Sequence, residues 1–176
     1  MNLSDLDDSQ YGQLFDVRRS IRYHDRRRAF FERAHRVTNV LTVLLAGSVL
    51  FELAGSNGTA GWLLALGAVS AVLAATDMVV GYAAQANLHQ SLRARFVGLE
   101  IAMLSMGNDE SAWRAHYQKR LEIERDEPPI YRALDLLCHN ELCRAEGIAQ
   151  NIKVGCFERL TSQLHTWPNI ATNTPA

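Results

Sequence analysis

Two apolar stretches in the first half of the chain dominate its pattern of hydrophobic and polar positions. The first runs from Val37 to Ala54, and the second runs from Trp62 to Ala84. From Leu63 to Ala75 the second stretch has no polar side chain except Ser70. A helix on the surface of a soluble protein shows one polar face, so this stretch requires either lipid or complete burial around it.

The two stretches predict a transmembrane helical hairpin. Crossing the hydrocarbon layer of a bilayer takes roughly 20 mostly apolar residues, and the second stretch has that length. The first stretch reaches it when Thr38, Asn39 and Glu52 lie near the two interfaces. Gly55-Ser-Asn-Gly58, which lies between them, is typical of a turn. The alternative is a hairpin buried in a soluble helical bundle, but enclosing two such helices would take most of the remaining chain.

The rest of the chain follows helical periodicity, so we expect an all-α fold in which the hairpin joins a cytoplasmic helical bundle. An arginine-rich helix (residues 1–36) precedes the hairpin (37–84), and cytoplasmic helices (85–167) precede a flexible tail (168–176). Within 85–167 the pattern predicts four helices, over 85–106, 112–125, 130–144 and 148–166. Asp109 or Ser111 can cap the second of these.

An apolar stripe marks the first of these four helices. Its members recur at intervals of three or four residues: Leu88, Leu92, Phe96, Leu99 and Met103. This spacing predicts one buried helix face, packed against the N-terminal helix.

Composition narrows the class of protein. The chain has 176 residues, is 48% hydrophobic and 8% aromatic, and has a formal net charge of −1. These values exclude collagen-like and disordered chains and do not indicate a nucleic-acid-binding protein. We expect no signal peptide, because the first apolar run begins late and no cleavage site is evident.

Positive charge is distributed very unevenly. No Lys or Arg lies between Val37 and Leu92, whereas Arg93 and Arg95 follow the second stretch. Eight arginines precede the first stretch: Arg18, Arg19, Arg22, Arg26, Arg27, Arg28, Arg33 and Arg36. The positive-inside rule then predicts that both termini are cytoplasmic and that the turn between the stretches lies outside.

Three uses of these eight arginines remain open. They can contact anionic lipid, where each charge near the surface is worth about 1 kcal/mol. They can pair with acids of the C-terminal helices, for which Glu122, Glu124, Asp126 and Glu127 are candidates. They can also form a pocket for a phosphate-bearing regulator. We favour the first two together.

Six polar residues within the hairpin are candidates for facing water. They are Asp77, Asn39, Thr42, Thr38, Thr76 and Ser70. Folding the hairpin about Asn57 and Gly58 places Asp77 at the depth of Thr38 and Asn39. There it can accept from the Asn39 amide or the Thr42 hydroxyl, face water in a pore, or lie at the interface. Two helices cannot enclose a channel, so a pore requires a homo-oligomer, and Gly67-x-x-x-Ala71 supplies small residues for packing in lipid. We place Glu52 at headgroup level.

No catalytic, cofactor or metal site is evident from motif and spacing. Cys138 and Cys143 are five residues apart, so on one helix they point about 140° apart and do not converge on one ion. They are expected to be reduced thiols in a helical core. The histidines form no pair at a spacing of four, and phosphate-loop and nucleophile motifs are absent. The sequence therefore predicts a chain that is not an enzyme.

One arrangement resembles a known family. The segment Val17-Arg-Arg-Ser-Ile-Arg-Tyr-His-Asp-Arg-Arg-Arg-Ala-Phe-Phe31, followed by a two-helix hairpin and a helical tail, resembles the SLATT domain. Two later stretches also look like the C-terminal half of such proteins: Glu124-x-Asp126-Glu127-Pro128-Pro129-x-Tyr131-x-Ala133-Leu134-Asp135 and His139-Asn140-Glu141. The similarity covers most of residues 11–167.

The resemblance implies a role in prokaryotic antiphage defence or programmed cell death. Such effectors are proposed to oligomerise and perforate the bacterial inner membrane when a partner detects infection. Partners in this class include SMODS nucleotidyltransferases, SLOG nucleotide sensors and reverse transcriptases. The family has no catalytic residues to transfer. The alternative is a non-conducting membrane anchor whose helical part docks cytoplasmic proteins.

Overall fold

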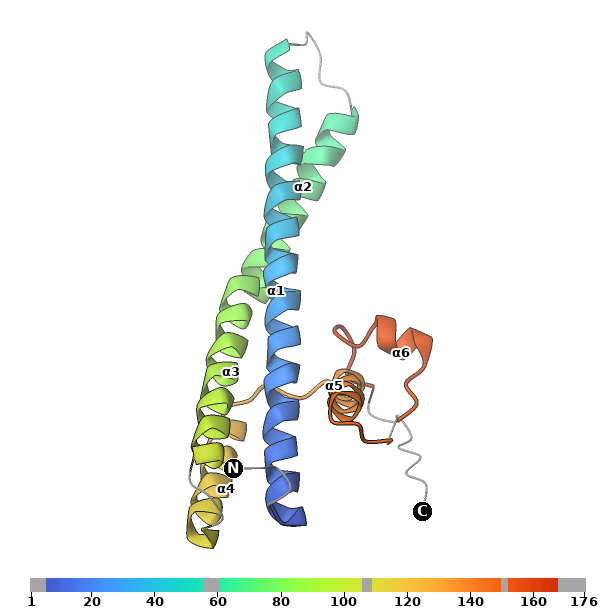
Figure 1. Cartoon of the computed structure of the whole chain (residues 1–176). Coiled ribbons are helices and arrows are strands. Elements are labelled where there is room, and N and C mark those ends of the chain that lie inside the picture. The colour runs from blue at the N-terminus through green and yellow to red at the C-terminus, as the bar shows by residue number, and fades with distance from the viewer. Residues whose placement is uncertain (1–5, 56–60, 106–108, 150–151, 168–176) are drawn as a thin grey trace. The chain divides into compact units, whose positions relative to one another are not determined.

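A computed structural model describes residues 6–55, 61–105, 109–149 and 152–167, and of residues 50–55 it describes only the helical backbone. All the secondary structure in these ranges is helical, which confirms an all-α fold (Figure 1). The helices are α1 (Asp8–Gly55), α2 (Gly61–Val80), α3 (Tyr82–Ser105), α4 (Glu110–Glu124), α5 (Arg132–Ala145) and α6 (Cys156–Leu160). The chain divides into two compact units: unit 1 is residues 1–27 and 89–176, and unit 2 is residues 28–88.

The main core of unit 1 forms between the start of α1, the end of α3 and α4. Leu14 and Val17 of α1 are fully buried against the apolar stripe of α3. Four of the five residues expected in that stripe are buried, namely Leu92, Phe96, Leu99 and Met103. Leu88, the fifth, is exposed. The predicted packing on the N-terminal helix is therefore confirmed for the part of α3 in unit 1.

A second apolar cluster of unit 1 covers another face of α1. Tyr23 packs against Leu134 and Cys138 of α5, and its hydroxyl accepts a hydrogen bond of 2.9 Å from the backbone N–H of Tyr131. That bond occupies an amide just before α5, where Pro128 and Pro129 end the preceding turn. The start of α1 therefore lies between two sets of helices, and both sets bury its side chains.

The prediction of a last helix over 148–166 is wrong for most of that range. The pattern predicts a helix over 148–166, but among the described residues of this range, 148–149 and 152–166, only Cys156–Leu160 is helical. Asn140 of α5 explains part of the difference, because its side chain forms two hydrogen bonds with the backbone of Ile152. The Asn140 amide thus bonds both the N–H and the carbonyl of Ile152, as a neighbouring backbone would, and these two groups are then not used within a helix. Gly147, with a φ of +74°, ends the preceding segment.

The other predicted helices of unit 1 differ only at their ends. The helix expected over 112–125 spans Glu110–Glu124, and the helix expected over 130–144 spans Arg132–Ala145. Asp109 is the N-cap of α4, and its carboxylate accepts the N–H of Ser111 at 3.0 Å. Of the two candidate caps, the structure therefore uses Asp109.

Unit 2 pairs the second part of α1 with α2 in an antiparallel arrangement. The Ser70 hydroxyl donates to the carbonyl oxygen of Thr42, His35 contacts Asp77, and the rings of Phe31 and Tyr82 lie 6.4 Å apart. In each of these three contacts the two residue numbers average about 56. The register of the two antiparallel helices is therefore constant along the pair. The intervening residues 56–60, which include most of the predicted turn, lie outside the described residues.

Gly81 interrupts the helix predicted for the second apolar stretch, residues 62–84. Its φ is +63°, in the left-handed region, and it separates α2 from α3. The Gly81 N–H still donates to the Asp77 carbonyl and the Gln85 N–H to the Gly81 carbonyl, at 2.8 and 2.9 Å. Glycine adopts this conformation without the steric cost that a Cβ brings, which explains why the interruption occurs at this residue.

We predict that Gly81→Ala lowers the free energy of unfolding of the full chain in detergent by about 1–2 kcal/mol, the cost of a left-handed backbone with a Cβ. Thermal unfolding followed by circular dichroism measures the change. Gly98→Ala is the matched control, because Gly98 lies within α3 and a Cβ there meets nothing within 4 Å. That substitution should stabilise α3 slightly. Equal effects at the two positions would contradict the role given to Gly81.

Candidate functional site

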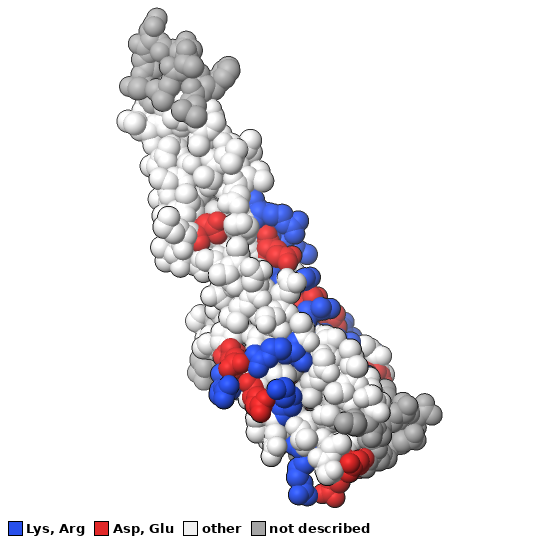
Figure 2. All heavy atoms as spheres, turned by 90° about the vertical axis from the view of Figure 1, so that its left-hand side faces the viewer, with Lys and Arg blue, Asp and Glu red and all other residues white. Residues whose placement is uncertain are grey.

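The helix pair of unit 2 exposes apolar side chains over most of its described surface. Large hydrophobic residues of both helices are at least 40% exposed: Val37, Val40, Leu41, Val43, Leu44, Trp62, Leu64, Val69, Val72, Met78, Val79 and Val80. No Lys, Arg, Asp or Glu lies within 37–49 or 61–76. Figure 2 shows a broad area without charged side chains.

One helical stretch in the described residues, Gly61–Ser105, is long and apolar enough to cross a membrane. Only 11% of its apolar window is buried, whereas the core helix of a soluble protein would be mostly buried. Arg93, Arg95 and Glu100 occupy the second half of this stretch, so its apolar part is α2. The first expected span, 37–54, is not a separate candidate in the described part of the chain. The side chain of Glu52 lies outside it.

A polar site connects the two helices near the C-terminal end of α2. The Nδ1 atom of His35 lies 3.0 Å from Oδ2 of Asp77, and the Asn39 amide nitrogen lies 3.1 Å from Nε2 of His35. One tautomer satisfies both contacts: Nδ1–H donates to the carboxylate, while Nε2 accepts from the amide. The side chain of Asp77 is only 19% exposed. We call His35, Asn39 and Asp77 the polar triad.

The partner of Asp77 differs from those expected. The sequence suggests Asn39 or Thr42, but the contact is with His35, about one helical turn before Asn39 and so nearer the N-terminus of α1. The physical reason is the register of the pair, which is centred near residue 56 and not on Asn57 and Gly58. The signal that sequence reasoning missed is His35-x-x-x-Asn39, which puts both side chains on one helix face.

The other predicted water-facing residues do not join the polar triad. Thr38 and Ser70 are buried, and the Ser70 hydroxyl donates to the backbone of Thr42 at 3.2 Å. The Thr42 hydroxyl is buried without a hydrogen-bond partner among the described residues. Thr76 is exposed, and its hydroxyl donates back to the Val72 carbonyl. The structure thus brings together Asn39 and Asp77 through His35, and Thr42 with Ser70.

Several of the eight arginines pair with acids of unit 1, but the acids are not those expected. Arg18 contacts Glu100 and Glu146 at 2.7 and 3.0 Å, Arg19 contacts Asp16 and Asp135, and Arg26 contacts Glu141 at 2.7 Å. The four acids proposed from sequence have other partners instead. Glu122 pairs with Lys119, Glu124 with Arg120, Asp126 with Arg95, and Glu127 with His24.

The remaining arginines have more varied surroundings. Arg27 is buried, donates to the backbone carbonyl of Gln163 at 2.7 Å, and lies 4.2 Å above the ring of Tyr131. Arg22 is half-buried. In unit 2, Arg28 and Arg36 lie near Glu32, each at 3.8 Å, and Arg33 and Arg36 are exposed.

A buried histidine pair in unit 1 was not found from the sequence. Nδ1 of His24 lies 2.9 Å from Nδ1 of His89, and Nε2 of His24 lies 3.1 Å from a carboxylate oxygen of Glu127. His24 also stacks on Phe96, with the ring centroids 5.6 Å apart. His24 and His89 are 65 residues apart, so no local spacing links them. A partial signal exists, because His89 precedes Leu92 and Phe96 at the spacing of the buried stripe.

The electrostatics of this pair follow from burial. Burial, together with nearby His24 and Arg27, lowers the pKa of His89 to about 4. His89 is therefore neutral at neutral pH. A pattern that satisfies both contacts has Nδ1–H of His89 donating to Nδ1 of His24, and Nε2–H of His24 donating to Glu127.

Cysteine and metal chemistry add no second site. Cys138 and Cys143 are buried free cysteines, and Cys156 is an exposed one. Burial raises the pKa of Cys138 to about 12, which keeps that thiol protonated. Within the described ranges, no group of three His, Cys, Asp or Glu side chains is placed to hold a metal ion.

Comparison of the chain with models of known protein families, with curated proteins and with solved structures finds no match.

We predict that acid destabilises unit 1 through His89. The pKa of His89 in the fold, about 4, lies below its ordinary value of 6.5, so between these values the unfolded chain binds a proton that the folded chain does not. The free energy of unfolding should fall by roughly 3 kcal/mol as pH drops from 6.5 to 4. Urea unfolding of the full chain in detergent, repeated across this pH range, measures the slope.

Carboxylates titrate in the same range, so the comparison is between variants. His89→Gln should flatten the slope. His165→Gln, which changes an exposed histidine, should leave it unchanged. The groups that face the pair are Tyr23, Arg27 and Glu127. A His89→Gln chain with the parental slope would show that His89 does not hold a lowered pKa.

Proposed function

We propose that this chain is an oligomeric membrane effector whose subunits insert α2 and the second part of α1 as a hairpin and then breach the ion barrier. The observation that carries the proposal is the apolar surface of that helix pair, which is exposed and free of charge over 37–49 and 61–76. Such a surface is far more compatible with hydrocarbon than with water.

The dimensions of α2 are consistent with insertion. Its 20 residues give a helix about 30 Å long, which equals the thickness of the hydrocarbon layer. Gly81 then lies at the end of the span, and Asp77 lies about one turn inside it. An ionisable side chain at that depth costs less than one at the bilayer centre. His35 contacts the Asp77 carboxylate directly, and Asn39 contacts the other ring nitrogen of His35.

A conducting state requires several copies of the chain, because two helices cannot surround an aqueous path. Gly67 has open space around it, so the small residues of Gly67-x-x-x-Ala71 are available for packing against another subunit. In this proposal Asp77, Asn39 and Thr76 line or flank the path. The other candidates, Thr38, Thr42 and Ser70, would face it only after the helices separate, because Thr38, Ser70 and the Thr42 hydroxyl are buried. With both termini in the cytoplasm, Asp77 of the polar triad would lie near the cytoplasmic end of this path.

Orientation and partners complete the proposal. The eight arginines before the first span favour a bacterial inner membrane with both termini in the cytoplasm. Exposed Arg33 and Arg36 are suited to anionic lipid. By resemblance to SLATT proteins, the trigger would come from a nucleotidyltransferase, a SLOG protein or a reverse transcriptase. The proposal assigns no reaction and no cofactor to the chain itself.

We predict that Asp77→Leu changes ion flux through vesicles that contain the purified chain, without preventing insertion. A carboxylate near an aqueous path attracts cations with an energy on the order of 1 kcal/mol, so its loss should lower the preference for cations over anions several-fold. Reversal potentials across a planar bilayer measure that preference. Asp8→Leu, an exposed aspartate of unit 1, is the matched control and should behave as the parent.

Two results would count against the proposal. If the Asp77→Leu and parent chains have the same preference for cations over anions, Asp77 does not line the ion path. Sustained membrane polarisation in cells that express the activated chain would favour the alternative function, a non-conducting anchor that docks cytoplasmic proteins. If the purified chain stays monodisperse in the supernatant after ultracentrifugation without detergent, both the membrane effector and the membrane anchor are overturned.

A further inference from the structure

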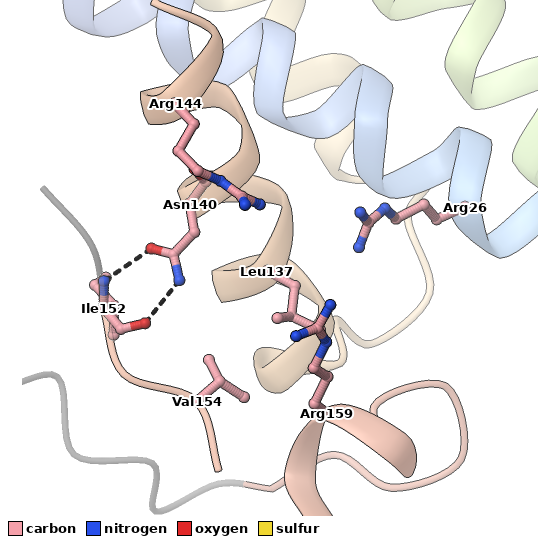
Figure 3. A pocket seen from close by; sticks show the side chains of 7 residues that line it. All are labelled: Arg26, Leu137, Asn140, Arg144, Ile152, Val154 and Arg159. Carbon is pink, nitrogen blue, oxygen red and sulfur yellow. Dashed lines mark hydrogen bonds between the residues drawn. The ribbon is translucent and has the colours of Figure 1, made fainter. Parts of the chain in front are cut away.

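A pocket of unit 1 is surrounded by three arginines from three different helices. Its volume is about 330 Å³, within the range of small-molecule sites. Arg26 of α1, Arg144 of α5 and Arg159 of α6 turn their guanidinium groups toward the same space in Figure 3. The other lining residues are Leu137, Asn140, Ile152 and Val154.

The charge of the pocket is strongly one-sided. Arg26 pairs with Glu141 at 2.7 Å. In the described part of the chain, no acid pairs with Arg144 or Arg159; Nε of Arg144 donates to the Asn140 carbonyl. Since Glu141 offsets the charge of Arg26, two uncompensated guanidinium groups remain around one small volume, and they repel each other unless an anion lies between them. Arginine is also the side chain best suited to bind phosphate through two parallel hydrogen bonds.

The wall opposite the arginines is held in place before any ligand arrives. Asn140 accepts the N–H of Ile152 at 2.8 Å and donates to its carbonyl at 2.6 Å. Ile152 and Val154 also pack against Ala133 and Leu136 of α5. Together with Leu137 they give the pocket an apolar wall, so it suits a ligand that joins an anionic group to an organic one.

We propose that this pocket binds a small phosphate-bearing ligand, with Arg144 and Arg159 as its principal contacts and Arg26 completing the charge. The source of the phosphate is either a free molecule such as a nucleotide or the headgroup of an anionic lipid. The inference is independent of membrane conduction, because it concerns residues of unit 1 alone.

The test uses the full chain in nanodiscs of phosphatidylcholine, titrated calorimetrically with inorganic pyrophosphate and with adenosine diphosphate. The variant is the double substitution Arg144→Gln/Arg159→Gln. The matched control is Arg114→Gln/Arg125→Gln, which removes the same charge from two exposed arginines outside this pocket. We expect the parent and control to bind at least one probe alike, and the variant to bind it at least tenfold more weakly.

A second arm separates the two sources of phosphate. The titration is repeated in nanodiscs that also contain phosphatidic acid. If the headgroup is the occupant, phosphatidic acid weakens probe binding to the parent. If the occupant is a free ligand, the lipid has no effect.

The proposal is overturned if neither probe binds the parent, or if the variant binds as well as the parent. Circular dichroism of the variant checks that it is folded. Arg144→Lys/Arg159→Lys, which keeps the charge, should recover part of the affinity, and failure to recover any would also count against the assignment. If the parent chain binds a probe but conducts no ions, the result counts against the proposed membrane function and not against this pocket.

Discussion

The structure of unit 2 depends on one constraint: its helix pair satisfies its backbone polar groups internally while many of its large apolar side chains point away from the partner helix. Fully burying such a side chain is worth about 1.5–3 kcal/mol relative to exposure in water. With a dozen of them exposed, the pair is poorly matched to water unless another apolar phase covers it. The polar contacts of the pair, at Thr42 and Ser70 and at the polar triad, lie between the helices. Helices that expose apolar groups and retain polar groups between them are the arrangement that lipid favours.

Local periodicity was sufficient to predict most of the helices and part of the core. The stripe from Leu92 to Met103 and the cap at Asp109 follow from spacings of a few residues, because helix formation and capping are local. The break at Gly81 was not predicted, since a glycine within a helical pattern is compatible with either a continuous or a bent helix. Register was also missed by about one turn, because it depends on turn geometry that the pattern of apolar residues does not specify.

Long-range contacts account for the other differences. Asn140 acts on a backbone 12 residues away, and His24 meets a histidine 65 residues away. Local spacing identifies neither partner, although the position of His89 in the stripe with Leu92 and Phe96 indicates that His89 itself is buried. The arginines illustrate the same limit: a basic helix face is equally compatible with lipid and with acids. In the structure, Arg18, Arg19 and Arg26 form ion pairs with acids of unit 1. Arg33 and Arg36 are exposed.

The bond pair between Asn140 and Ile152 has a consequence for the chemical ageing of the protein. Deamidation would convert the amide into a carboxylate, which can accept the Ile152 N–H but has no hydrogen to offer the carbonyl. Two oxygens 2.6 Å apart would then face each other, one of them charged, and the segment from Ile152 to Val154 would be pushed off α5. A single lost ammonia molecule would thereby open one wall of the arginine pocket while every helix stayed intact.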